Sequence, residues 1–231
     1  LGFEYKMPWL EREAVLRTHA PYTTGTVSVS VGGTALTGAS TAWATANSYG
    51  ENNARTTGKI NIAGTNDLYR ISAVGSDTTI TLDTRYVASA DASAAAYTYF
   101  EDEYALASDF LRPLDHRSFT SAYQLPIIGT RRFHELYPRP FTSGRPTVVT
   151  IVDLAPSGST TPIKRAVMFP YPADTYLMPY SYITSNLAVS STGVAAANLS
   201  AATDEPLFPL RYRHAIILHA LYHWYRDKKD D

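Results

Sequence analysis

The sequence contains no cysteine among its 231 residues. Disulfide bridges, thiolate nucleophiles and zinc sites built from cysteine are therefore excluded, because each of them needs a cysteine sulfur. A chain without thiols is indifferent to the redox state of its compartment. Cysteine usage thus gives no indication of secretion.

Charge and long apolar runs are also scarce. Charged residues make up 18% of the chain, and 20 basic against 21 acidic residues leave a formal net charge of −1. Such a chain has no positive field to collect nucleic acid or an anionic membrane. The longest apolar runs, such as Ala215 to Leu218, fall far short of the roughly 20 residues that span a bilayer. We expect a soluble protein with no membrane partner, whose monomer does not bind DNA tightly.

Motifs for catalysis are missing as well. The sequence has no Gly-x-Ser-x-Gly nucleophile elbow and no Gly-Lys-Ser/Thr phosphate loop. Gly58-Lys59-Ile60 comes nearest to a phosphate motif, but apolar Ile60 stands where a hydroxyl is needed for magnesium. The sequence therefore predicts a protein that is not an enzyme, with no catalytic residue, no cofactor and no metal.

The chain is instead rich in apolar residues and in tyrosine. Apolar residues make up 45% of the sequence, enough to bury a core in one large domain or two small ones. The 17 tyrosines stand out, because tyrosine gives a large contact area together with a polar handle. Tyrosine-rich surfaces suit protein interfaces or sugar binding. Core and edge-strand packing is expected for at least half of Tyr171, Tyr176, Tyr180 and Tyr182.

A change of composition indicates an inserted module at 24–100. This stretch is rich in Thr, Ser, Ala and Gly and almost free of proline, whereas its flanks are rich in proline and tyrosine. Its short β-prone runs predict six or seven antiparallel strands in a small barrel or sandwich. Besides an initial hairpin, the predicted strands are 58–62, 68–74, 78–83 and 95–100.

The initial hairpin is the clearest local signal. Apolar and polar residues alternate over 25–31, Gly32-Gly33 supplies a turn, and the chain returns over 34–38. The alternation predicts one core face, made of Val27, Val29 and Val31, then Ile60 with Ile62, and Ile80 with Leu82.

Residues 1–23 and 101–231 are predicted to form a body around this module. Pro8 to Glu13 looks like a helix start, while 14–22 could run on as an extended strand, and both alternatives stay open. Further strands are predicted at 147–154, 165–169 and 176–182. The predicted fold class is α+β and β-rich: a body with strands and a C-terminal helix, interrupted by the inserted antiparallel β-barrel or sandwich.

The C-terminal segment changes to a helical period. Pro209 suits a first helical turn, and apolar residues then recur at helical spacing, which predicts a helix over about 209–228. We expect this helix to carry the partner interface, made of Leu210, Tyr212, His214, Ile217, Leu221, Trp224 and Tyr225. Because the chain opens at Leu1 without methionine and stops at Asp231 in a charged tail, we also expect it to be a segment of a longer product.

His219 and His223 are four residues apart on this helix and would share a face. That is the spacing of a helical metal pair, but residues 220–222 lack the glutamate of a zinc protease motif. We favour interfacial or solvent-facing imidazoles.

The acidic run Glu101-Asp102-Glu103 directly follows a predicted strand. Paired carboxylates can hydrolyse glycosidic bonds when they are held at the right separation. Adjacent residues on an extended chain point to opposite sides, however, so these three are not expected to converge. A solvated acidic linker, or a partner for basic residues of a neighbouring subunit, is the favoured interpretation.

Three groups of motifs, taken in order, carry a family resemblance. The first is the β-module, with 22–29, 33–38, Trp43, 68–71 and 79–83. The second is Tyr104-x-Leu106-x-x-Asp109-Phe110, although Ala107 stands where proline is expected, and the third comprises 167–172, 176–182 and 204–214. Together they resemble the head-to-tail adaptors and tail tubular connectors of tailed bacteriophages.

The resemblance implies a non-catalytic virion protein, made in the host bacterial cytoplasm, whose copies form a ring at the neck. A dodecamer is the expected form of this ring, with the portal protein on one side and a downstream neck or tail protein on the other. DNA would only pass through its lumen, and a near-neutral subunit suits a channel that must not grip DNA.

Two other functions stay open. The first is the main alternative, a tail or fibre-associated β-rich binding module that contacts host glycan or another tail protein. A glycan-degrading tail enzyme would need two carboxylates that converge in a tyrosine-lined cleft.

Overall fold

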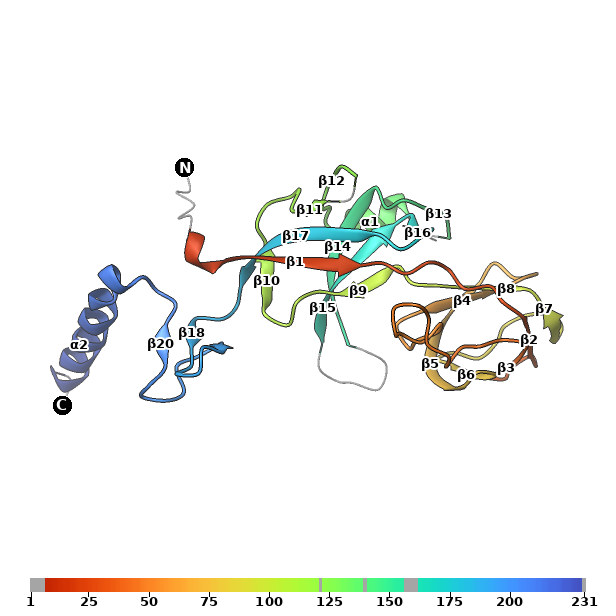
Figure 1. Ribbon diagram of the computed structural model, residues 1–231, viewed down its shortest axis with the longest axis horizontal. Coiled ribbons are helices and arrows are strands. Elements are labelled where there is room, and N and C mark those ends of the chain that lie inside the picture. The colour runs from red at the N-terminus through yellow and green to blue at the C-terminus, as the bar shows by residue number, and fades with distance from the viewer. Residues whose placement is uncertain (1–6, 121, 139–140, 156–161, 230–231) are drawn as a thin grey trace. The chain divides into compact units, whose positions relative to one another are not determined.

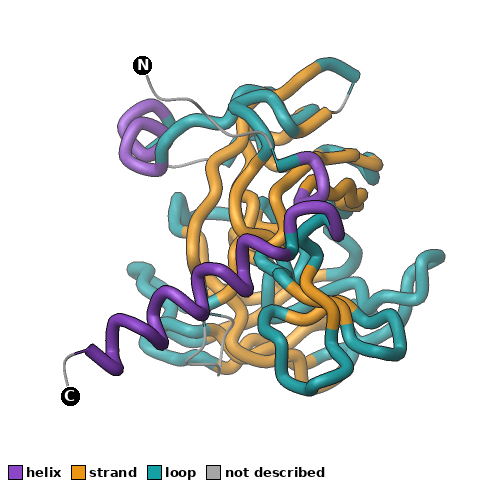
Figure 2. The backbone as a smooth tube through the Cα atoms, turned by 90° about the vertical axis from the view of Figure 1, so that its left-hand side faces the viewer, coloured by secondary structure: helices purple, strands orange, loops and turns teal. Residues whose placement is uncertain are grey.

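The computed structural model describes residues 7–120, 122–138, 141–155 and 162–229 (Figure 1). Strands make up most of its regular structure, and the longest helix is near the C-terminal end (Figure 2). The β-rich α+β class predicted from the sequence is thereby confirmed. The chain divides into a terminal unit of 1–13, 109–115 and 181–231, and a central unit of 14–108 and 116–180. The module boundaries at 24 and 100 stay a prediction.

The largest sheet lies in the central unit and has seven antiparallel strands. Their order is β7-β2-β3-β6-β5-β4-β8, and the sheet curls into a half-barrel (Figure 1). The strands are β2 (Thr26–Val29), β3 (Ala35–Ala39), β4 (Lys59–Ile62), β5 (Leu68–Ser76), β6 (Thr79–Leu82), β7 (Ala92–Ala95) and β8 (Tyr97–Phe100).

The predicted hairpin is confirmed as the β2–β3 pair, with Val27 opposite Gly38. Gly32 has a φ of +76°, which a residue without a Cβ adopts at little cost. The prediction for Val31 was wrong. Strand β2 ends at Val29, and Val31 lies in the turn, where its side chain is exposed and its N–H donates to Asp91 Oδ1 at 2.7 Å.

The predicted core face is otherwise confirmed, since Val27, Val29, Ile60, Ile62, Ile80 and Leu82 are all buried. Trp43 is fully buried among them, and its Nε1–H donates to the Tyr97 hydroxyl at 2.9 Å. A Cβ at Gly38 would collide with the Trp43 ring, so glycine is required where β3 passes this indole.

The rest of the central unit holds a second sheet and a short helix. The sheet consists of β14 (Val148–Leu154), β15 (Ile163–Phe169) and β9 (Glu103–Ala105) in antiparallel order. Helix α1 (Thr130–Leu136) places Phe133 in a core with Val148 and Val167. Shorter strands complete this part: β11 (Phe119–Thr120), β12 (Gln124–Leu125), β13 (Ser143–Gly144) and β16 (Tyr171–Pro172).

Two strands run from one unit into the other. A single 3-10 turn, η1 (Pro8–Leu10), precedes β1 (Glu11–Arg17), so the N-terminal segment combines a helical start with an extended strand. Strand β17 (Leu177–Thr184) pairs with β11 at Tyr180 and, in the terminal unit, with β10 (Phe110–Pro113). The predicted strands at 147–154, 165–169 and 176–182 are thus confirmed to within two residues at each end.

The terminal unit ends in the predicted helix. A small sheet of β18 (Ala188–Val189), β19 (Ala195–Ala196) and β20 (Glu205–Pro206) leads to the 3-10 turn η2 (Leu210–Tyr212) and to α2 (His214–Lys229). The α-helical bonding starts later than predicted because the first turn after Pro209 is a 3-10 turn, in which Tyr212 N–H donates to the Pro209 carbonyl. None of the described helices is long and apolar enough to cross a membrane.

Candidate functional site

The predicted interface residues of the C-terminal segment are all exposed. Among the apolar and aromatic members other than His214, the exposed fraction ranges from 42% at Tyr212 to 77% at Leu210. His214 is exposed as well, and so are Ile217, Leu221, Trp224 and Tyr225. Apolar side chains of this size seldom gather on a protein surface without a partner. That they bind a partner stays a prediction.

Helix α2 has two distinct sides. Ala215, Ile216 and His219 line an apolar groove of the terminal unit, with a volume of about 530 Å³. Successive residues of a helix are rotated by about 100°, so Ile217 and Leu221 point away from that groove. The remaining walls of the groove are Met7, Trp9, Leu10, Leu187, Ala197, Asn198, Leu199, Pro206, Leu207 and Phe208.

The two histidines of α2 contact each other. Nε2 of His219 lies 3.2 Å from Nε2 of His223, and the rings meet edge to face at 4.5 Å between centroids. Among residues 7–120, 122–138, 141–155 and 162–229, no group of three or more His, Asp or Glu side chains is placed to hold a metal ion. The observed contact of the pair is this hydrogen bond between the two rings.

The prediction of a solvated acidic linker at 101–103 was wrong. Glu101, Asp102 and Glu103 are 3%, 0% and 3% exposed. Each carboxylate has a basic partner in the same chain, namely Arg55 for Glu101, Lys59 for Asp102, and both Lys59 and Arg70 for Glu103. The run therefore forms a buried ion network in the central unit.

Glu101 is held by three donors. Arg55 Nε donates to its Oε1 at 2.8 Å, Thr57 Oγ1 donates at 3.2 Å, and the Tyr99 hydroxyl donates to the same oxygen. Burial, together with the Glu101 carboxylate, raises the pKa of Tyr99 well above its ordinary value. Tyr99 therefore stays protonated and serves as a donor.

Lys59 bridges the other two carboxylates. Its Nζ lies 2.7 Å from Asp102 Oδ2 and 2.9 Å from Glu103 Oε1. Burial raises the pKa of Asp102 against the opposing effect of Lys59. Burial acts in the same direction on Glu103, but Lys59 and Arg70 outweigh it and hold the pKa of Glu103 below its ordinary value.

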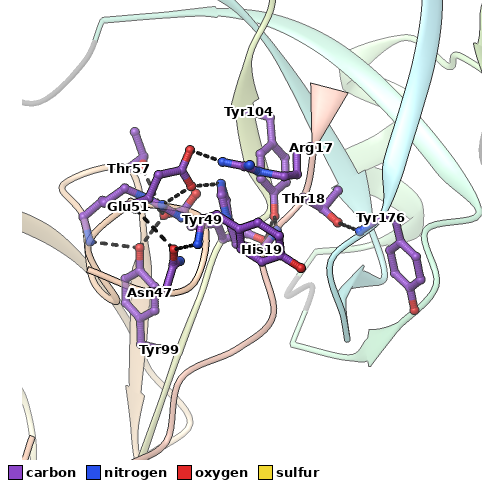
Figure 3. Close-up of polar contacts among 12 residues, drawn as sticks. Arg17, Thr18, His19, Asn47, Tyr49, Glu51, Thr57, Tyr99, Tyr104 and Tyr176 are labelled. Atoms are coloured by element: carbon purple, nitrogen blue, oxygen red, sulfur yellow. Dashed lines mark hydrogen bonds and ion pairs between the residues drawn. The ribbon is translucent and has the colours of Figure 1, made fainter. Parts of the chain in front are cut away.

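A fourth carboxylate extends this network toward solvent. The Asn47 side-chain oxygen accepts the backbone N–H of Glu51 at 3.2 Å, and the Glu51 carboxylate then contacts Arg17, His19 at 3.2 Å and Arg55 at 2.9 Å (Figure 3). Burial would raise the pKa of Glu51, but His19 and the two arginines lower it. The hollow beside these residues has a volume of about 380 Å³.

This arrangement does not suit general acid catalysis. A catalytic acid needs a carboxyl group whose pKa is raised toward neutrality and which can reach a substrate. Glu51 and Glu103 have lowered pKa values, and the raised pKa belongs to Asp102, whose side chain is 1% exposed. The carboxylates do converge, contrary to expectation, but they converge on basic side chains.

The register of the strands brings this network together. In the antiparallel pairing, Lys59 lies opposite Arg70 on one side and opposite Phe100 on the other, directly before the acidic run. The sequence contained one signal for this: Lys59 and Arg70 each alternate with buried residues of a strand. Their partners became evident only with the pairing of β4, β5 and β8.

His19 is the neutral member of the network and predicts a pH dependence. Burial lowers its pKa and Arg55 adds to this effect, although Glu101 and Glu51 oppose it. The unfolded chain therefore takes up a proton near the ordinary pKa of 6.5, whereas the folded chain resists it until lower pH. The free energy of unfolding should fall as pH drops below about 6.5, and His19→Gln should make this fall shallower.

Chemical denaturation at several pH values between 7 and 5 measures the effect. His134→Gln, which changes an exposed histidine of α1, is the matched control and should leave the slope unchanged. Equal slopes for wild type and His19→Gln would contradict the assignment.

Comparison with known proteins gives no relative for this chain: no family model, curated protein or solved structure matches it.

Proposed function

We propose that this chain is a non-catalytic structural subunit of a tailed-phage virion, which forms a ring at the head-to-tail neck. In this role it links the portal protein to the tail and continues the DNA channel. The observation that carries the proposal is the exposed apolar face of α2, because contiguous exposed apolar patches mark sites of contact with a partner. The order of the motifs resembles that of phage adaptors, and this resemblance favours the neck as the location of the protein in the virion.

The buried ion network supports the non-catalytic part of the proposal. Its buried carboxylates are neutralised by arginine and lysine inside one unit, an arrangement that suits a role in holding the fold. We further propose that residues 24–100 form an inserted module whose curled sheet folds independently of the ring contacts.

The sugar-binding alternative has weaker support. This alternative rests on the tyrosines, but many of them are buried in the protein. The buried ones are Tyr69, Tyr86, Tyr97, Tyr99, Tyr104, Tyr171, Tyr180 and Tyr182. Three of the four tyrosines for which packing was expected are among them. The tyrosines therefore serve the core more than a glycan surface.

Electron microscopy of the purified chain, alone and with the cognate portal protein, tests the proposal. Rings are expected for the full chain. Truncation before Pro206 removes η2 and α2 and should abolish rings and portal attachment, while the seven-stranded sheet still folds. A cooperative thermal transition of the truncated chain verifies that the sheet is intact. Intact rings from the truncated chain would overturn the role of α2, and glycan binding without rings would favour the tail-fibre alternative.

A further inference from the structure

A separate polar pocket of about 250 Å³ lies in the central unit between the two sheets. Its polar walls are Thr56, Thr57, Arg70, Asp83, Glu103 and Arg165, and we call it the Arg165 pocket. It belongs to a different unit from α2, and its chemistry is independent of ring formation.

Arg165 is a buried cation without a counterion. It lies on β15 opposite Val152 and Ala105, and it is 4% exposed. Its Nε has no hydrogen-bond partner, and within the described part of the chain its guanidinium forms no ion pair. Arginine does not lose its proton in proteins, so the side chain keeps its charge in the interior. A buried charge without a partner is strongly destabilising.

The acidic residues of the pocket do not relieve this cost. Glu103 is engaged by Lys59 at 2.9 Å and by both terminal nitrogens of Arg70. Asp83 is exposed and therefore largely screened by water. The network around Glu103 is thus complete without Arg165, whose charge calls for an anion from outside the chain.

We propose that the Arg165 pocket binds an oxyanion, that is, a carboxylate or phosphate group. The planar guanidinium of Arg165 matches either group, since it can donate two parallel hydrogen bonds to a pair of oxygens. The hydroxyl of Thr56, on the wall of the pocket, supplies a further donor. The volume of about 250 Å³ is several times the roughly 30 Å³ that one water occupies, so a phosphate or a small dicarboxylate fits.

Calorimetric titration of the full chain with inorganic phosphate and, separately, with malonate tests this at constant ionic strength. Arg165→Gln should weaken binding of the preferred anion at least tenfold. Asp83→Asn removes a negative charge from an exposed position of the pocket wall and should tighten binding about threefold, because the repulsion between an exposed charge and the anion is weak but not absent. Asp67→Asn, a change at an exposed residue that does not line the pocket, is the control and should have no effect.

Each outcome is decisive. Binding of phosphate but not malonate assigns a phosphoryl ligand, and the reverse assigns a carboxylate. Absence of both, or affinities that neither Arg165→Gln nor Asp83→Asn changes, would overturn the proposal. Asp83→Asn keeps the test valid if Arg165→Gln fails to fold. Rings formed by the full chain would be unaffected by either result, so the two proposals fail separately.

Discussion

Lys59→Met is expected to lower the free energy of unfolding by about 3–5 kcal/mol, the range for breaking a buried ion pair by removing one partner. Lys59 is the only cation within 4 Å of Asp102 in the described residues, and Asp102 is completely buried. The substitution leaves that carboxylate in the interior without its counterion, while Glu103 keeps only Arg70. Methionine fills a similar volume, so the loss reports on charge more than on packing.

The loss should also depend on pH. Burial already raises the pKa of Asp102 against Lys59, and removing Lys59 removes that opposition. With a folded-state pKa above the unfolded one, the variant is more stable at low pH and loses stability as pH rises. The difference between wild type and Lys59→Met should therefore be smaller at pH 5 than at pH 8.

Urea denaturation at both pH values measures these effects. Lys164→Met is the matched control, because Lys164 pairs with the exposed Asp153 at 3.0 Å and surface pairs contribute at most about 1 kcal/mol. The double variant Lys59→Met/Asp102→Leu removes both charges and should recover much of the loss. Equal effects of Lys59→Met and Lys164→Met would show that the buried network does not stabilise the fold.

The strands were predictable because their signal is local. Alternation of valine with serine over 27–30 predicts a half-buried strand whichever neighbour it pairs with, and the structure confirms β2 there, paired with β3. The prediction that Val31 is buried was wrong because the alternation continues into the turn. In a turn the backbone conformation, and not the sequence pattern, determines which way a side chain points. The α-helical start after Pro209 was displaced for a similar reason, since helix ends depend on a few backbone bonds.

The ion network was not predictable because its partners are distant in sequence. Arg55 and Glu101 are 46 residues apart, and Lys59 and Asp102 are 43 apart. A run of three acids in a sequence is typical of a solvated segment. Only the pairing of β4 with both β5 and β8 places cations on the same side as these acids, and pairing between strands is fixed by the packing of the whole sheet.

The double variant Ile217→Asp/Leu221→Asp is expected to abolish rings and to weaken subunit association about a hundredfold or more. These side chains are 62% and 44% exposed and lie one turn apart on the side of α2 that faces away from its own groove. Exposure means that the isolated chain loses little packing when they are replaced, so its thermal transition should stay within a few degrees. In a ring, by contrast, each carboxylate would be buried against an apolar partner, at a cost of about 1.5 kcal/mol or more per residue.

Sedimentation velocity and electron microscopy of the variant measure the outcome. Val194→Asp is the matched control, because Val194 belongs to the same unit and at 63% is as exposed as Ile217, but lies outside the predicted interface. Rings from Val194→Asp and none from the double variant would assign assembly to this face of α2. Rings from both would mean that α2 uses its other side, the one that Ala215, Ile216 and His219 turn toward the groove, or that another surface closes the ring. The apolar face would then owe its exposure to a partner other than a second copy of this chain, and the portal protein would be the first to examine.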